Sequence, residues 1–334
     1  MRFAVTGATG FLGANLVRSL LDDGHEVRAL IRKPNPLIDG LNIETLKVPL
    51  VGSDSEHLGQ LTNALSGCDG VFHVAGIFDP SPGGEERMHR VHVEATDALC
   101  RASGSANVKR LVLCSSSITV GYGERDSPGD EDTPLDADAT YGKTGALRAY
   151  HDTKLAGEAR VATADEVEGV IVNPDFILGP WDVKPTSGQL IVSMARGYMP
   201  FYPQGGKCFQ TASDCARGHI LAMENGRAGH RYLLGSHNLS YREFMMKVAQ
   251  VVGKAPPRFP LPGWVTAGAG LVGRVGSRFD SHRFAGLDAN VLRSMQANRY
   301  RCDRRAQEEL GLKPSPIDEG IQAAYNWFVE RGYC

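Results

Sequence analysis

The stretch TGATGFLG at residues 6–13 decides the fold of this chain. It follows a short apolar run and opens a segment of helical period at residues 11–21. Glycines allow a tight turn, a close approach of an anion to the backbone, and close packing of the helix on the strand. The helix N-terminus adds free N–H groups and the positive end of the helix dipole. The stretch therefore predicts a turn that binds the pyrophosphate of a dinucleotide, through Gly7, Thr9, Gly10, Phe11, Leu12 and Gly13.

Strand-like and helical patterns alternate through the first half of the chain. Short runs rich in Val, Ile, Leu and Phe are separated by segments of helical period. The runs lie at residues 2–6, 26–31, 44–49, 70–74, 110–115 and 169–173. This alternation predicts an α/β fold with a doubly wound parallel sheet of the Rossmann type.

After this half the pattern loosens into helices and short strands, at residues 232–234, 241–252, 303–310 and 317–331. We expect a dinucleotide-binding domain over residues 1–175 and a smaller α/β substrate-binding subdomain over residues 176–334. Some of the second part is expected to cross back to the first. The loop at residues 121–140 is dense in Gly, Pro and Asp, follows a strand end, and is expected to border the active site.

The end of the second strand indicates which dinucleotide is bound. A site specific for NAD(H) has a carboxylate there, which holds the ribose 2′-hydroxyl. This chain has Arg32 and Lys33 instead, and their charges neutralise a 2′-phosphate. We therefore expect NADP(H), with NAD(H) as the alternative.

Tyr150 and Lys154 are one turn apart on the same face of a predicted helix. Hydride delivery to a carbonyl creates an alkoxide, which needs a proton donor. A phenol, with a pKa near 10, donates readily at neutral pH if a neighbouring cation lowers that pKa. A serine at residues 115–117, after the fifth strand, is placed to stabilise the developing oxyanion.

With these motifs the chain resembles the extended short-chain dehydrogenase/reductase superfamily. The resemblance also covers VFHVAG at 71–76, VKRLVLCSSS at 108–117, YHDTKLAGE at 150–158, NPDFILGP at 173–180, SDCARGHILA at 213–222 and RRAQEELGLKPSPIDEGI at 304–321. Among its branches the chain looks most similar to dihydroflavonol-4-reductase-like proteins.

The resemblance implies a catalytic set of Ser116, Tyr150 and Lys154, with Ser117 as the alternative serine. Lys154 would also hold the nicotinamide ribose, and Tyr150 would share in that site. The resemblance implies further cofactor contacts at Ala75, Gly76, Pro174 and Phe176. It also implies a homodimer formed through the helix that bears Tyr150 and its neighbour.

Three positions depart from the family pattern. Leu50 and Val51 stand where relatives carry a Gly-Asp pair whose Asp holds the adenine, and Asp54 comes slightly too late. His92 stands where relatives favour Asn, and Phe176 stands where nucleotide-sugar enzymes often have Asn. The substrate side is therefore expected to be apolar.

The first expected function is NADPH-dependent reduction of a small or medium apolar ketone or aldehyde, with Tyr150 as proton donor. The alternative is a nucleoside-diphosphate-sugar 4-epimerase with tightly bound NAD, in which Arg217 or other C-terminal arginines would bind the diphosphate. The absence of a carboxylate after Ser116 argues against a dehydratase. A non-catalytic dinucleotide sensor is disfavoured because both Tyr150 and Lys154 are present.

Composition narrows the remaining possibilities. The net charge of −2 argues against a nucleic-acid partner. Seven scattered cysteines and the lack of a signal peptide favour a cytoplasmic protein, and the histidine spacing (His89, His92) predicts no metal site. The apolar stretch at 261–273 is too short to span a bilayer. It is expected to be a packed or substrate-covering helix, with interfacial membrane contact as the alternative.

Overall fold

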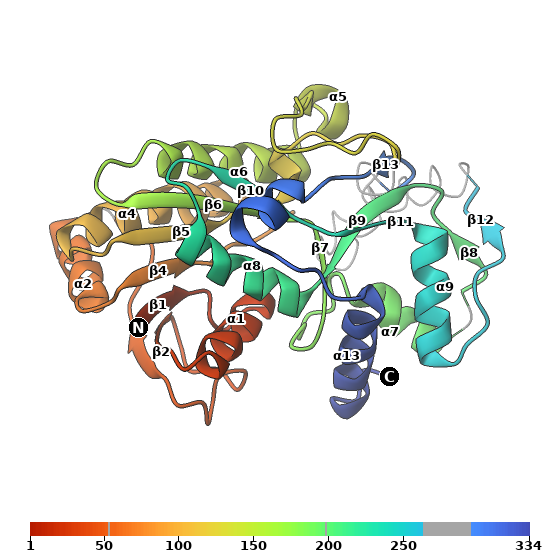
Figure 1. Cartoon of the computed structure of the whole chain (residues 1–334), viewed down its shortest axis with the longest axis horizontal. Coiled ribbons are helices and arrows are strands. Elements are labelled where there is room, and N and C mark those ends of the chain that lie inside the picture. Colours follow the sequence, from red (N-terminus) through yellow and green to blue (C-terminus); the bar gives the residue numbers. More distant parts are fainter. Residues whose placement is uncertain (53, 198, 263–294) are drawn as a thin grey trace.

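The computed structural model describes residues 1–52, 54–197, 199–262 and 295–334. A seven-stranded sheet forms its larger part (Figure 1), with the strand order β10-β6-β5-β4-β1-β2-β3 and every neighbouring pair parallel. Its strands are β1 (Arg2–Thr6), β2 (Glu26–Ile31), β3 (Glu44–Lys47), β4 (Gly70–His73), β5 (Arg110–Cys114), β6 (Glu168–Pro174) and β10 (Arg231–Leu234). The predicted doubly wound parallel sheet is confirmed.

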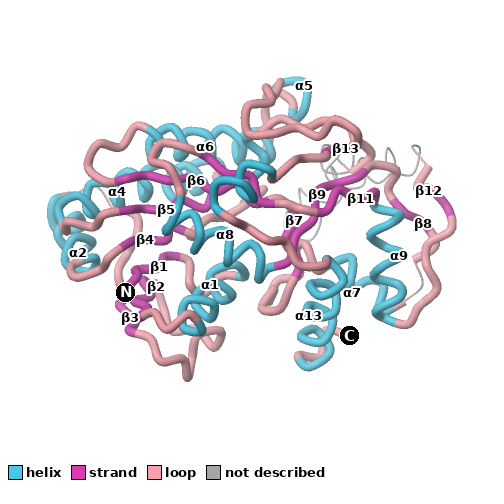
Figure 2. Tube along the Cα trace, viewed as in Figure 1, coloured by secondary structure: helices cyan, strands magenta, loops and turns pink. Residues whose placement is uncertain are grey.

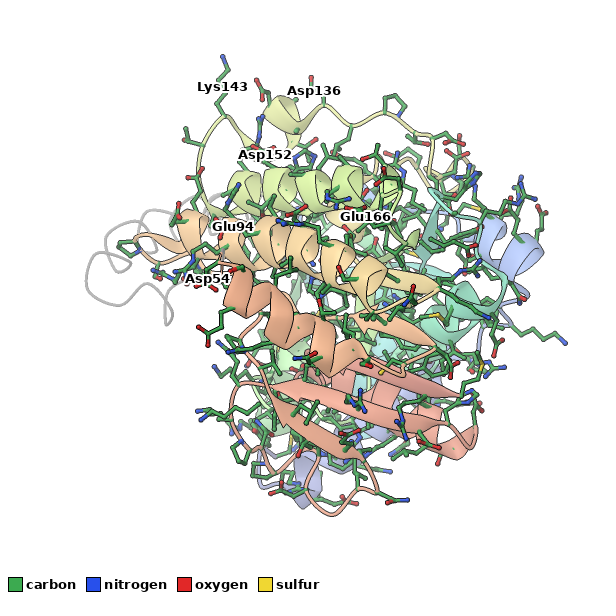
Figure 3. All side chains as sticks on the ribbon, turned by 90° about the vertical axis from the view of Figure 1, so that its left-hand side faces the viewer. Asp54, Glu94, Asp136, Lys143, Asp152 and Glu166 are labelled. Atoms are coloured by element: carbon green, nitrogen blue, oxygen red, sulfur yellow. The ribbon has the colours of Figure 1, made fainter. Side chains whose placement is uncertain are left out.

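Helices cover both faces of this sheet, because its strands carry apolar side chains on both sides. One face packs on α1 (Phe11–Asp22) and α8 (Ala212–Asn225). The other packs on α2 (Ser55–Leu65), α4 (Ala95–Ser105) and α6 (Ala146–Ala162), which lie side by side in Figure 3. Between β4 and α4 the chain passes through α3 (Gly84–His89) and a π-helical turn, η1 (Arg90–Glu94).

A smaller C-terminal lobe lies beside the carboxyl edge of the large sheet (Figure 2). Its four-stranded sheet joins β7 (Phe176–Leu178), β9 (Gly206–Thr211), β11 (His237–Ser240) and β13 (Asn298–Arg299). Its helices are α7 (Gln189–Arg196), α9 (Tyr241–Val252) and α13 (Ile317–Glu330), around their own core. A second strand pair joins β8 (Phe201–Tyr202) to β12 (Phe259–Pro260).

Local sequence signals account for several boundaries. Helix α9 begins at the predicted residue because Ser240 and Glu243 form a capping box, and it ends before Gly253, which has φ +67°. The strand expected at 232–234 is present as β10, but it is the edge strand of the large sheet beside β6. Helix α8 also returns to that sheet. The C-terminal half therefore contributes to both lobes.

The loop expected at residues 121–140 is largely irregular, with a short helix α5 (Ala137–Tyr141) at its end. The apolar stretch expected to form a helix at 261–273 lies, apart from its first two residues, outside the described residues. Among the helices that the structure describes, none has both the length and the apolarity to cross a membrane.

Candidate functional site

The glycine turn joins β1 to α1 at the carboxyl edge of the large sheet. Gly7 has φ +71°, and a Cβ atom there would lie 2.6 Å from the backbone nitrogen of Ala75. A Cβ at Gly13 would lie 2.1 Å from the carbonyl oxygen of Gly7. Only glycine therefore fits at these two positions, which bring β1, α1 and the turn after β4 into contact.

The first turn of α1 is open to a ligand. Gly10 is the N-cap residue, and no side chain caps the helix. Thr9 and Phe11 are half-buried and Leu12 is buried at this end of the helix. Uncapped N–H groups and the helix dipole make the turn suited to a pyrophosphate, so the residues present fit a dinucleotide.

Arg32 and Lys33 directly follow β2, and both side chains are exposed. Strand β2 lies next to β1 in the sheet, so both cations are on the same edge as the glycine turn. No carboxylate side chain stands at residues 31–35, at the end of the strand.

No carboxylate stands at residues 50 and 51, where the resemblance implies one that holds the adenine. Asp54 lies at the N-terminal end of α2 (Figure 3) and accepts a hydrogen bond of 2.7 Å from the backbone N–H of His57. Asp54 is therefore used as a helix cap. Leu50 and Val51 are half-buried beside it.

A directional hydrogen-bond chain holds the turn that carries Ala75 and Gly76. The Ala75 N–H lies 3.3 Å from Thr6 Oγ1, which is 2.8 Å from Nδ1 of His73. His73 Nε2 lies 3.1 Å from Thr96 Oγ1, and that hydroxyl donates to the carbonyl of His92 at 2.7 Å. The Thr96 hydroxyl has one proton, which it donates to that carbonyl, so it can only accept a hydrogen bond from His73 Nε2. His73 is therefore protonated on Nε2 and accepts a hydrogen bond from Thr6 at Nδ1.

His92 holds the other end of the same turn. Its Nε2 accepts the N–H of Ile77 at 3.1 Å, so the neutral ring carries its proton on Nδ1 and donates it to Thr153 Oγ1 at 2.9 Å. Burial lowers the pKa of His92 to about 2 and that of His73 to about 3, which keeps both rings neutral. His92 thus supplies one acceptor and one donor, as the amide of the Asn that the resemblance implies at this position would.

Ser116, Tyr150 and Lys154 come together next to this turn. Ser116 is half-buried just before the turn η2 (Ser117–Thr119) and close to Tyr150, whereas Ser117 is buried. The ring of Tyr150 packs edge-on against His92, at 5.5 Å between ring centroids, and against Phe78 at 5.6 Å. A Cβ at Gly76 would lie 3.1 Å from the Lys154 ammonium.

The sequence predicted that Lys154 lowers the pKa of Tyr150, and the structure differs from that prediction. Burial raises the pKa of Tyr150 to about 12, and the hydrogen bond with Ser116 opposes only part of that rise. Lys154 does not lower it in this arrangement, since its ammonium donates to the carbonyl of Cys114 at 2.9 Å. Burial also lowers the pKa of Lys154. Tyr150 is therefore a fully protonated phenol at neutral pH.

Glu158 is a functional candidate that sequence reasoning missed. Its Oε1 accepts hydrogen bonds from Ser115 at 2.5 Å, Thr119 at 2.6 Å and Asn173 at 2.7 Å. Thr119 and Asn173 in turn lie 3.0 and 3.1 Å from the carbonyl oxygen of Ser116. The sequence signal that could have indicated Glu158 is its spacing from Lys154. The two residues lie one turn apart on the same face of α6.

Strand β6 ends in a second group that the sequence did not reveal. Pro174 is buried and Phe176 half-buried, and between them the buried Asp175 carboxylate pairs with Arg301 at 2.5 Å. Arg301 also donates to the carbonyls of Val120 and Gly121, at 2.9 and 3.1 Å. One side chain thus joins both lobes and the 121–140 loop.

Arg217, expected as a diphosphate ligand in the epimerase alternative, is elsewhere. It lies on α8 and forms an exposed ion pair of 2.7 Å with Asp23, the residue that follows the last residue of α1. In the described ranges no cluster of three or more metal-ligating side chains was found.

Comparison with known proteins identifies the family of this chain and solved structures of the same fold. The model of the NAD dependent epimerase/dehydratase family matches residues 3–235. A protein of Synechocystis sp. named "Putative dihydroflavonol 4-reductase" is 32% identical, over 99% of this chain and 95% of that protein. The crystal structure of gox2253 has a TM-score of 0.82 at 31% identity, covering 99% of this chain and 98% of its own. That of PA4631, a nucleoside-diphosphate-sugar epimerase from Pseudomonas aeruginosa, has a TM-score of 0.76 at 25% identity, covering 100% and 99%.

Proposed function

Because the chain belongs to the NAD dependent epimerase/dehydratase family, we propose that it is an NADPH-dependent reductase of ketones or aldehydes with an apolar body. The observation that carries the proposal is that Tyr150, a protonated phenol packed against His92, lies beside Ser116 and one helical turn from the buried Lys154. NADPH would supply a hydride to the carbonyl carbon. The glycine turn, Ala75, Gly76, Pro174 and Phe176 would hold it.

Side chains of this chain would stabilise and protonate the carbonyl oxygen of the substrate. Ser116 donates a hydrogen bond to the carbonyl oxygen as negative charge develops on it. Tyr150 transfers its phenolic proton to that oxygen, which yields the alcohol and a phenolate. The buried Lys154 ammonium, one helical turn from Tyr150, stabilises the phenolate when it turns from the Cys114 carbonyl. Glu158 keeps the Ser116 backbone in place through Asn173, which bonds both residues.

NADPH rather than NADH is proposed because of the exposed cations Arg32 and Lys33 at the end of β2. Residues 176–334 would supply most of the substrate pocket. A homodimer through α4 and α6 is also proposed, and it is supported by the exposed Leu155 on α6. All seven cysteines are unpaired thiols, which supports a reducing compartment such as the cytoplasm.

The competing function is 4-epimerisation of a nucleoside-diphosphate sugar, and the similarity to PA4631 favours it. It predicts NAD that stays with the protein through purification. The pairing of Arg217 with Asp23 weighs against it, because that arginine was the diphosphate ligand expected from the sequence.

The test is NADPH oxidation against aromatic, aliphatic and steroid-like ketones and aldehydes, with UDP- and dTDP-sugars in parallel. The proposal predicts stoichiometric NADPH loss and alcohol formation with at least one carbonyl compound. Interconversion of a sugar nucleotide without net cofactor consumption would overturn it in favour of the epimerase.

A further inference from the structure

A group of three cations lines the substrate side of the site. Arg299 on β13 and Lys207 on β9 are register partners in a parallel pair, so their side chains leave the same face of the small sheet. Arg301, two residues after Arg299, points to that face as well. Asp175 is the carboxylate that pairs within this group in the described part of the chain.

The charges do not balance. Arg301 occupies one oxygen of Asp175 at 2.5 Å, and Lys207 lies 3.7 Å from the other, which is buried and has no hydrogen-bond partner in the described residues. Arg299 forms no ion pair within those residues, and its buried Nε atom likewise has no hydrogen-bond partner there. Three cations thus face one carboxylate, and the two that are half-buried, Arg299 and Lys207, are accessible to an anion that would balance the surplus charge.

Arg299 is nonetheless held in a defined place. Its guanidinium lies 5.1 Å from the ring centroid of Tyr122 and 5.4 Å from that of Tyr141. The two aromatic rings hold the guanidinium in place, and a guanidinium can form two parallel hydrogen bonds with a carboxylate.

This cation group adjoins the catalytic side chains. Tyr141 donates to the carbonyl of Ile118, two residues beyond Ser116, and packs on His151, the neighbour of Tyr150. The Lys207 ammonium lies 5.1 Å above the ring of Phe176, at the carboxyl end of β6. The surplus charge is therefore on the side where a substrate would extend away from Ser116 and Tyr150.

We infer that the carbonyl substrate carries a carboxylate, which Arg299 and Lys207 bind while its apolar body lies along Phe176 and Tyr122. The inference rests on the proposed function and sharpens its substrate class from an apolar carbonyl compound to an oxo acid. The charge state of Lys207 agrees with this inference. Burial and the like charges of Arg301 and Arg299 lower the pKa of the Lys207 ammonium, and a bound carboxylate would offset that effect.

The test compares each oxo acid with its own methyl ester, using phenylglyoxylate and 4-oxo-4-phenylbutanoate as probes. We expect kcat/KM for the acid to exceed that for the ester by about tenfold or more in at least one pair. Arg299→Gln and Lys207→Gln should reduce that ratio about tenfold, mainly through the KM of the acid. Arg242→Gln is the matched control, because Arg242 also stacks on a tyrosine of the same lobe, Tyr202. It should keep the ratio.

Esters turned over as well as acids in both pairs would overturn the inference, as would an equal loss for acid and ester in Arg299→Gln. Calorimetric binding of the same pairs to Tyr150→Phe separates this from failure of the reductase proposal. Preferential binding of the acid that Arg299→Gln abolishes supports the inference even if no reduction occurs. Equal binding of acid and ester refutes it even if the enzyme is a reductase.

Discussion

Arg32 is the residue on which the choice of cofactor depends. If it pairs with a 2′-phosphate, Arg32→Ser should weaken NADPH binding by about 10- to 100-fold and leave NADH binding nearly unchanged. Fluorescence titration with both cofactors measures this. Arg258→Ser, at an exposed arginine of the other lobe, is the control. Equal affinity of the unaltered protein for NADH and NADPH would refute the role of Arg32.

His92 makes a prediction about pH. Its folded pKa of about 2 is far below the ordinary value of 6.5, so the unfolded chain binds more protons below that value. The stability that the neutral ring supports is thus complete above pH 6.5 and is lost as the pH falls. His92→Asn keeps an acceptor for Ile77 and a donor for Thr153 but does not titrate.

Urea unfolding between pH 6.5 and pH 5 tests this. The stability loss should be shallower in His92→Asn than in the unaltered protein, by a difference in slope that rises to about 1.4 kcal/mol per pH unit near pH 5. His230→Asn, at an exposed histidine, should leave the slope unchanged. An identical slope in His92→Asn and the unaltered protein would show that His92 titrates normally.

At the scale of elements, Glu158 couples α6 to the ends of β5 and β6. Glu158→Gln weakens the bond to Asn173, which also donates to the Ser116 carbonyl. We expect kcat to fall about tenfold with little change in cofactor affinity, because small displacements of a catalytic group are costly. Glu166→Gln, at a partly exposed glutamate paired with Arg160, is the control. If both variants retain full kcat, Glu158 does not position Ser116.

Elements were predictable where one local signal determines them. The glycine turn, the apolar runs and the cap at Ser240 lie within a few residues of the structures they form, so β1, β2 and α9 have their predicted bounds. The sheet partner of β10 was not predictable, because a short apolar run does not encode which strand it joins. The same holds for Glu158, whose partners lie 15, 39 and 43 residues away.

At the scale of the whole molecule, the pair of Asp175 and Arg301 joins the two lobes. The residues are 126 apart in sequence, so their meeting could not be read from either segment alone. Arg301→Met leaves a buried carboxylate with only Lys207 nearby, and should lower the free energy of unfolding by about 3–5 kcal/mol. Lys247→Met, which breaks an exposed pair with Asp318, should cost about 1 kcal/mol or less. Similar urea midpoints for the two variants would contradict this account.

The most direct test of the central claim, that this chain reduces a carbonyl group with Tyr150 as proton donor, is the turnover of Tyr150→Phe. The variant should lose about 10²- to 10⁴-fold in kcat while binding NADPH as the unaltered protein does. Tyr325→Phe, which removes a hydroxyl from α13, should retain full activity. Turnover by Tyr150→Phe within about threefold of the unaltered enzyme would contradict the account, because the reaction would then draw its proton from another group.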